Sequence, residues 1–301
     1  MDIKQLNSHH AIAEQLSIIS GNGGLPCIEI NNEKARALIS IYAGQVLEYQ
    51  PVGDNNNLLF LSNKAHYQSG KAIKGGIPIC WPWFGPDPDG LGRSAHGFAR
   101  NVTWQVHATK AVSENETVIS LSLCDDEQSR LIWDHAFELI LEISIGASLG
   151  LTLTTRNKGD KTFTISQALH TYFNVGDISK VSVEGLDNHD YLDKAASGEQ
   201  KQQQGAIEVN AEVDRIYLDA PSELIINDVA LERRIHINTS GNKTAVVWNP
   251  WSDICAQMAD LEDNAYQQFI CVETTNAADD TVDIEPGGEY VLSAEYKVVS
   301  R

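Results

Sequence analysis

The feature that most constrains this chain is a period-two alternation of apolar and polar side chains, which recurs along most of its length. In residues 137–145, FELILEISI, every odd-numbered side chain is apolar. Such alternation sends successive side chains to opposite faces of a strand with one buried side. The same pattern lies between turn-rich segments at residues 117–124, 149–156, 180–185, 222–227, 234–238, 244–249, 268–273 and 289–296.

The fold class follows from this repetition. Amphipathic helices of ten or more residues are hard to find, whereas a parallel β/α fold needs one between most of its strands. We therefore predict an all-β chain, built as a large antiparallel β-sandwich of two packed sheets. Neither an internal repeat nor a Pro- or Ser-rich linker divides the chain, so we expect a single domain over residues 1–301.

Two long stretches interrupt the alternation. Residues 74–100, KGGIPICWPWFGPDPDGLGRSAHGFAR, are rich in Gly, Pro and aromatic side chains. A loop of this length in a compact domain is usually functional or disordered, and Trp81, Trp83 and Phe84 favour order. Residues 193–205, DKAASGEQKQQQG, are polar and Gln-rich, and we expect a mobile surface segment there.

Composition narrows the possible partners. The chain has 42% hydrophobic and 21% charged residues, which is typical of soluble globular proteins, and no apolar run approaches the roughly 20 residues of a membrane span. A net charge of -19 disfavours nucleic acid and membrane surfaces, so an anionic substrate would need a local group of cations. The N-terminus does not resemble a secretory signal, and the five scattered cysteines form no CxxC pair, which together indicate a cytoplasmic location.

Two candidate acid/base residues stand close to strand ends. His170 follows the apolar QAL, and Glu273 ends QFICVE. Burial of a carboxyl group raises its pKa toward that of a useful base. His170 could equally be a packed histidine bonded to a backbone carbonyl, and Glu273 could lie on an exposed strand edge.

Three cationic or titratable side chains flank the long loop. Lys74 precedes the GGIP turn, where it could bind an anion or be solvated. His96 and Arg100, in AHGFAR, could bind a substrate or hold the loop together.

Four further residues offer polar or aromatic contacts. Asp214 and Arg215, in DRIY, could bind sugar hydroxyls or form an ion pair with each other. Trp248 and Asn249, in VVWNPW, suit sugar stacking and hydrogen bonding, although a tryptophan at a strand end is more often part of the core.

Common metal and nucleotide motifs are missing from the sequence. The nine histidines include no HxH or HExxH pair, and neither GxGxxG nor GxxxxGK[ST] is present. A GxSxG serine hydrolase motif is absent too. We therefore expect no metal and no organic cofactor, which leaves acid/base chemistry or no chemistry.

Six segments together resemble the hexose-6-phosphate mutarotases, or glucose-6-phosphate 1-epimerases, a branch of the aldose 1-epimerase family. The segments are GGIPICWPWFGP, AHGFAR, ALHTYFNVGDI, DRIY, VVWNP and FICVET, and the resemblance runs from about residue 25 to the C-terminus. It implies a galactose-mutarotase-like β-sandwich. It also implies interconversion of the α and β anomers of a hexose 6-phosphate, such as D-glucose 6-phosphate, without a cofactor.

The resemblance also assigns roles by motif. It implies that His170 is the general acid and Glu273 the general base. His96 and Asp214 would orient the substrate, and Arg100 would line the phosphate site. In such a pair, we expect Glu273 to favour the charged form of His170.

One position departs from the family pattern. The residue before GGIP is commonly arginine, and here it is Lys74, which keeps the charge but lacks the planar fork that grips phosphate. Tyr172 and Phe173 would wall the site. We expect a monomer that acts on a small phosphorylated sugar.

Two alternatives stay open at this point. A non-catalytic carbohydrate-binding module could use the same fold, since fold does not determine function. A glycoside hydrolase would need a second acid near Glu273, for which Asp214 is the candidate.

Overall fold

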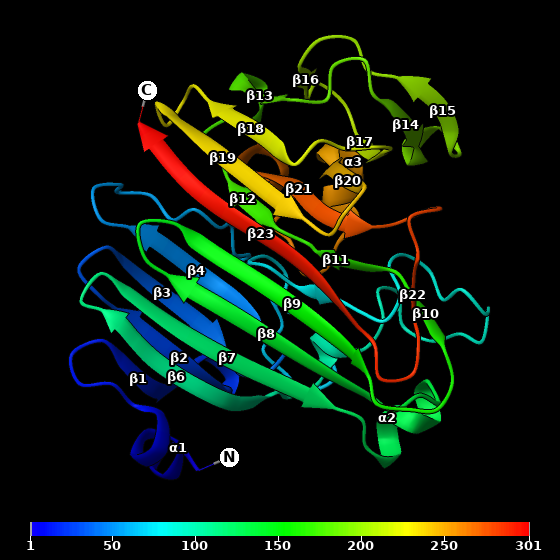
Figure 1. Cartoon of the computed structure of the whole chain (residues 1–301). Helices are drawn as coiled ribbons and strands as arrows, with labels where there is room; N and C mark the ends of the chain where they lie inside the picture. The colour runs from blue at the N-terminus through cyan, green and yellow to red at the C-terminus, as the bar shows by residue number, and fades with distance from the viewer. Residues whose placement is uncertain (1, 301) are drawn as a thin grey trace.

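The computed structural model describes residues 2–300, which fold mostly into antiparallel strands (Figure 1). Two large sheets dominate, so the predicted all-β class and antiparallel sandwich are confirmed. The first large sheet has nine strands. In spatial order they are β16 (Ile207–Glu208), β13 (Val181–Glu184), β18 (Glu223–Asp228), β19 (Arg233–Ser240), β23 (Glu289–Ser300), β9 (Leu149–Asn157), β8 (Phe137–Ile145), β7 (Glu116–Cys124) and β6 (Gln105–Ser113).

The second large sheet has eight strands. Its main path is β15 (Glu199–Gln202), β14 (Asp190–Asp193), β17 (Val213–Tyr217), β20 (Thr244–Asn249), β21 (Phe269–Asn276), β11 (Gln167–Leu169) and β5 (Ile79–Cys80). The strand β12 (Tyr172–Asn174) also pairs with β21, next to β11 along the same edge. Because every residue of β21 is buried, this strand forms a rigid centre for the sheet.

Two small sheets and three short helices complete the structure. The N-terminal sheet contains β1 (Leu16–Ser20), β2 (Pro26–Asn31), β3 (Ala35–Ser40) and β4 (Gln45–Pro51), and the other pairs β10 (Phe163–Ile165) with β22 (Val282–Ile284). The helices are α1 (Ile3–His10), α2 (Glu127–Ile132) and α3 (Trp251–Gln257). Within residues 2–300, no helix combines the length and the apolar character that crossing a membrane requires.

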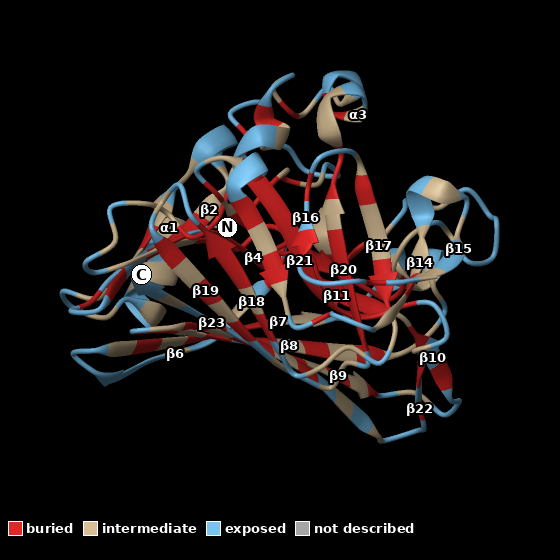
Figure 2. Ribbon diagram, turned by 90° about the horizontal axis from the view of Figure 1, so that it is seen from above, coloured by how far each residue is buried: buried red, intermediate tan, exposed pale blue. Residues whose placement is uncertain are grey.

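The hydrophobic core lies between the two large sheets. The odd-numbered side chains of β8 are all buried, as the alternation predicts, and they join one continuous apolar cluster with Ile270 and Val272 of β21. Phe173 of β12 meets Tyr296 of β23 with ring centroids 5.3 Å apart. Figure 2 shows buried residues along the strands of both layers. The two sheets therefore hold each other in place, and β21 and β12 are fixed from behind.

The two irregular stretches behave differently. Residues 74–100 are ordered, as predicted: Trp81 is fully buried, and the Arg93 guanidinium lies 4.3 Å from the ring centre of Trp83. The expectation of a mobile segment at residues 193–205 is wrong. This segment contributes the edge strand β15, which pairs with β14, and Lys201 Nζ lies 2.8 Å from Oδ2 of Asp193. Backbone pairing and this ion pair order a segment whose composition is polar.

Candidate active site

The pairing of β21 with both β11 and β12 brings His170 and Glu273 together. Leu169 of β11 pairs with Thr274, and Tyr172 of β12 pairs with Cys271. His170 lies in the chain between these two paired positions. The Nε2 atom of His170 is 3.4 Å from Oε1 of Glu273. Only 3% of Glu273 is exposed, so the exposed-edge interpretation of this carboxylate is wrong.

The position of His170 is set by the backbone on its other side. Its N–H donates to the carbonyl of Pro78 over 3.0 Å, and the Tyr172 N–H donates to the carbonyl of Gly76. The segment that follows Lys74 thus runs along β11 and β12 and holds the histidine against Glu273. Since these bonds are made by the backbone, the side chain of His170 is left available for chemistry.

One face of the eight-stranded sheet carries the surrounding side chains. Asp214 pairs with Trp248, Trp248 with Cys271, and Cys271 with Tyr172, so these four residues form a row across β17, β20, β21 and β12. Directly paired residues point to the same face of a sheet. Glu273 is two residues beyond Cys271 and therefore shares that face.

Aromatic rings pack around His170. The Tyr172 ring stacks nearly parallel to the imidazole at a centroid distance of 4.9 Å, and Trp248 approaches edge-on at 6.1 Å. Trp248 therefore belongs to the site face, as one interpretation of the sequence proposed. Phe173 does not wall the site: it points into the core, because neighbouring residues of a strand face opposite ways.

His96 reaches the same place from the long loop. Its ring centroid lies 5.8 Å from that of His170, and its Nδ1 accepts a hydrogen bond of 3.3 Å from the Gly85 N–H. Burial, with the charges of Arg100 and Lys74, lowers the pKa of His96 to about 3. The ring is therefore neutral at physiological pH, with Nδ1 as acceptor and Nε2 as donor.

Lys74 and Arg100 supply positive charge to the site. Both charges contribute to the lowered pKa of His170. Arg100 donates from Nη2 to the Ala95 carbonyl over 3.1 Å, and Lys74 Nζ lies 3.4 Å from Oδ2 of Asp260. The Lys74 side chain is only 18% exposed, so it is not simply solvated. The site face thus has two cations close by, on a chain of strongly negative net charge.

Burial controls the protonation of the central pair. It raises the pKa of the Glu273 carboxyl well above its usual range, and the charge of Asp214 adds to this. It also lowers the pKa of His170, helped by His96, Arg100 and Lys74. We expected Glu273 to favour the charged form of His170, but burial is the largest cause acting on the pKa of His170 and favours the neutral imidazole.

The other sequence candidates divide by the direction of their side chains. Asp214 is half-buried on the site face, where burial raises its pKa to about 6. Arg215 points to the opposite face, with its guanidinium 4.8 Å from the ring centre of Tyr191, so it does not pair with Asp214. Asn249 is structural: its amide donates to the carbonyls of Tyr266 and Phe269.

A possible metal-binding group also appears at this site. Among the described residues, His170, Cys271 and Glu273 place one ligand atom each within 4.8 Å of one another. Sequence inspection missed Cys271, although its spacing of two from Glu273 on one strand was a usable signal.

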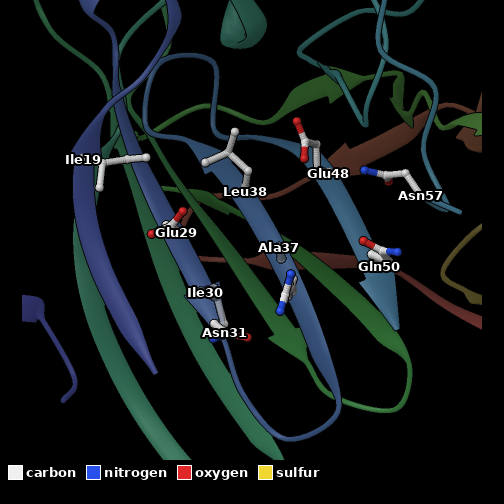
Figure 3. A pocket seen from close by; sticks show the side chains of 10 residues that line it. Ile19, Glu29, Ile30, Asn31, Ala37, Leu38, Glu48, Gln50 and Asn57 are labelled. Atoms are coloured by element: carbon white, nitrogen blue, oxygen red, sulfur yellow. The ribbon is translucent and has the colours of Figure 1, made fainter. Parts of the chain in front are cut away.

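A second feature, a hollow of about 480 Å³, lies away from these residues on the outer face of the N-terminal sheet (Figure 3). Glu29, Arg36, Glu48 and Gln50 point toward it from β2, β3 and β4. Glu29 and Glu48 are exposed, so this hollow lacks the desolvated carboxyl group that the sheet face around Glu273 provides. The hollow is therefore a weaker candidate for acid/base chemistry than the face around Glu273.

The fold and the site define a class of protein: an antiparallel β-sandwich with a buried histidine–carboxyl pair beside two cations. The chain belongs to the aldose 1-epimerase family, whose model matches residues 26–297. Membership confirms the resemblance seen in the sequence, and it makes the chain an isomerase of the mutarotase type, acting on sugar anomers.

Individual relatives agree with this assignment. The chain is 39% identical over 264 residues to a Cenchrus ciliaris protein named "Putative glucose-6-phosphate 1-epimerase", covering 84% of this chain and 78% of that protein. An Escherichia coli protein of the same name is 34% identical over 256 residues, 85% and 84% of the two chains. The crystal structure of a "putative mutarotase" from Salmonella typhimurium aligns over 99% of both chains with a TM-score of 0.90 and 30% identity.

A more distant structure shares the fold alone. A galactose mutarotase-like protein from Clostridium acetobutylicum has a TM-score of 0.76 and 16% identity, over 96% of this chain and 99% of that one.

Proposed function

We propose that this protein interconverts the α and β anomers of a hexose 6-phosphate, with D-glucose 6-phosphate as the first candidate. The observation that carries the proposal is the separation of 3.4 Å between His170 Nε2 and Glu273 Oε1, beside Lys74 and Arg100. Ring opening needs one proton removed and one added at two oxygens bonded to the same carbon. A closely spaced acid and base can serve both oxygens at once.

Ring opening uses both groups in concert. The Glu273 carboxylate takes the proton of the anomeric hydroxyl, and the His170 imidazolium donates a proton to the ring oxygen. The bond between C1 and the ring oxygen breaks, and C1 becomes an aldehyde. Glu273 is then protonated and His170 neutral.

Reclosure reverses these transfers after the aldehyde has turned about the C1–C2 bond. The hydroxyl that was the ring oxygen attacks C1 from the other side and returns its proton to His170, while Glu273 returns its proton to the new anomeric oxygen. The pKa shifts of the buried pair favour the neutral form of both groups, which is their state beside the open-chain sugar. The same burial therefore stabilises the protonation state that ring opening produces.

The phosphate has an electrostatic role in this scheme. Lys74 and Arg100 lower the pKa of His170, and a phosphate dianion bound to them offsets their charge. The substrate's own phosphate thereby favours the imidazolium that the first step requires. Binding energy at the phosphate also fixes the ring relative to His170 and Glu273, so it contributes to catalysis as well as to affinity.

The test is anomer exchange measured by NMR saturation transfer, with glucose 6-phosphate and glucose as substrates. Wild-type protein should accelerate exchange of the phosphate ester more than of glucose, relative to a sample without protein. Glu273→Gln should lower the catalysed rate by about 10²- to 10⁴-fold, the usual contribution of a positioned proton transfer. Glu29→Gln is the matched control, because it removes an exposed carboxylate on β2 and should leave the rate unchanged.

The same measurement distinguishes catalysis from the alternative that the protein is a non-catalytic carbohydrate-binding module. Such a module would show saturable sugar binding by NMR line broadening while exchange stays at the rate of the blank. That outcome, with folded wild-type protein, would overturn the proposed catalysis.

A further inference from the structure

We propose that His170, Cys271 and Glu273 form a binding site for a thiophilic divalent cation such as Zn²⁺, and that the bound ion blocks the acid/base pair. This goes beyond the proposed function, which uses no metal. The three residues are buried, and their ligand atoms all lie within 4.8 Å of one another.

The spacing fits tetrahedral coordination. Zinc binds imidazole nitrogen and carboxylate oxygen at about 2.0–2.1 Å, so two such ligands on a tetrahedron lie about 3.4 Å apart. The His170 Nε2 to Glu273 Oε1 distance is 3.4 Å. An ion between these two atoms would have the distances that zinc requires, and Cys271, whose ligand atom lies within 4.8 Å of both, would supply the third ligand.

The scaffold presents the ligands from two strands. Cys271 and Glu273 are two residues apart on β21 and share one face, and His170 comes from the neighbouring strand edge. The Glu273 Oε2 atom is buried and has no hydrogen-bond partner among residues 2–300. Three protein ligands leave a fourth corner of the tetrahedron open for water, as in zinc sites that are not purely structural.

The ligand set selects the kind of ion. Thiolate and imidazole favour Zn²⁺ and similar ions, while Mg²⁺ and Ca²⁺ prefer oxygen ligands. Cysteine binds such ions as a thiolate, so the ion must displace the proton of the Cys271 thiol. The charges of Lys74 and Arg100 oppose a cation here, whereas the carboxylate of Asp214 favours it.

Occupation of the site has a direct consequence for catalysis. An ion held by Glu273 Oε1 and His170 Nε2 occupies the two atoms that would move protons, so the same protein molecule cannot bind the ion and open a sugar ring. Inhibition should be competitive with the sugar and reversed by a chelator. This consequence rests on the proposed function, whereas binding of the ion does not.

The first experiment measures binding directly. Co²⁺ occupies the same nitrogen and sulfur sites as zinc, and it gives an ultraviolet charge-transfer band only when a thiolate is a ligand. Titration of reduced wild-type protein with Co²⁺ should produce this band, and Zn²⁺ should displace it. Cys271→Ser should abolish the band. Cys124→Ser, which changes the exposed cysteine at the end of β7, should retain it.

The second experiment measures inhibition of anomer exchange by Zn²⁺. The rate of each variant with the metal is compared with the rate of the same variant without it. The Zn²⁺ concentration for half inhibition should rise at least about tenfold in Cys271→Ser and stay unchanged in Cys124→Ser. A wild-type protein without the band, or a band that persists in Cys271→Ser, would overturn the site. A protein that shows the band but no anomer exchange would instead refute the proposed function and leave the metal site standing.

Discussion

Lys74 Nζ lies 3.4 Å from Oδ2 of Asp260, so one of the two cations that act on His170 already has a carboxylate partner. The two side chains are 18% and 27% exposed. A substrate phosphate that binds Lys74 must compete with this carboxylate. Pairs with partial solvent access contribute about 0.2–1 kcal/mol, which is enough to affect substrate affinity measurably.

Removal of the competing charge should therefore improve binding of the phosphate ester. We expect Asp260→Asn to lower KM for glucose 6-phosphate about two- to fivefold and to leave KM for glucose unchanged. Saturation-transfer rates over a range of sugar concentrations measure both values. Asp263→Asn is the matched control, since Asp263 pairs with the exposed Lys64 in the same region. Equal effects of both variants would show that only the overall charge matters.

The pH dependence should differ between phosphorylated and free sugar. In the proposed mechanism His170 must be protonated to act as the acid, so the rate should fall as pH rises through the pKa of His170 in the complex. Burial, Lys74 and Arg100 lower this pKa, and a bound phosphate offsets the two cations. With glucose 6-phosphate, kcat should therefore fall at a higher pH than with glucose.

Comparison of kcat profiles for the two sugars in the same buffers tests this. Lys74→Met should move the glucose profile to higher pH, because it removes one of the charges that disfavour the imidazolium. Coincident profiles for both sugars and for the variant would show that the phosphate does not act through His170.

Sequence patterns predicted the strands that have one polar face. Residues 137–145 form β8 with the expected bounds, because one face of this strand is buried and the other is partly exposed. The strands β3 and β4 were not recognised. Arg36 and Glu48 are exposed on the outer face, but consecutive buried residues at positions 39–40 and 45–47 interrupt the alternation that identifies a strand.

The candidate site was predictable in its parts but not in its assembly. His170 and Glu273 stood out singly, whereas their contact depends on the register of β11 and β12 against β21, which no local pattern encodes. Nothing in the sequence indicated that Asp260 lies at the site, because an aspartate in a loop is usually exposed to solvent. The direction of the His170 pKa shift also required the structure, since it depends on burial and on cations from distant segments.

The half-buried Asp214 should make stability depend on pH. Burial raises its pKa from 3.8 to about 6 in the folded protein. Below about pH 4 the residue is protonated in both states and has no differential effect. As pH rises through 6, the partly desolvated Asp214 must ionise in the folded protein. The free energy of unfolding that the protonated form of Asp214 contributes is then lost.

Asp214→Asn, which is neutral at every pH, should therefore be more stable than wild type at pH 7.5, by about 1 kcal/mol after allowance for solvent access. Near pH 4 the two proteins should have similar stability. Urea unfolding at both pH values, followed by tryptophan fluorescence, gives the difference. A stability gain that is equal at both pH values would exclude ionisation of Asp214 as the cause.

The position of His96 depends on the glycine that follows it. Gly97 has a φ of +70°, and a Cβ at this position would lie 1.9 Å from the carbonyl oxygen of Trp81. Gly92, in the same loop, has a similar φ of +78° but nothing within 4 Å of the corresponding Cβ. Since both positions are left-handed, the two glycines separate the cost of the backbone conformation from the cost of the clash.

Gly92→Ala should cost about 1–2 kcal/mol, from the left-handed conformation alone. Gly97→Ala must in addition displace the backbone of the fully buried Trp81, so we expect a loss of more than about 3 kcal/mol. Because this movement also shifts His96 away from His170, anomer exchange should fall in Gly97→Ala under conditions where the variant is still folded, and remain near wild type in Gly92→Ala. Urea unfolding and saturation transfer on the same samples measure both effects. Equal stability and equal activity of the two variants would show that the close approach to Trp81 does not hold His96 in place.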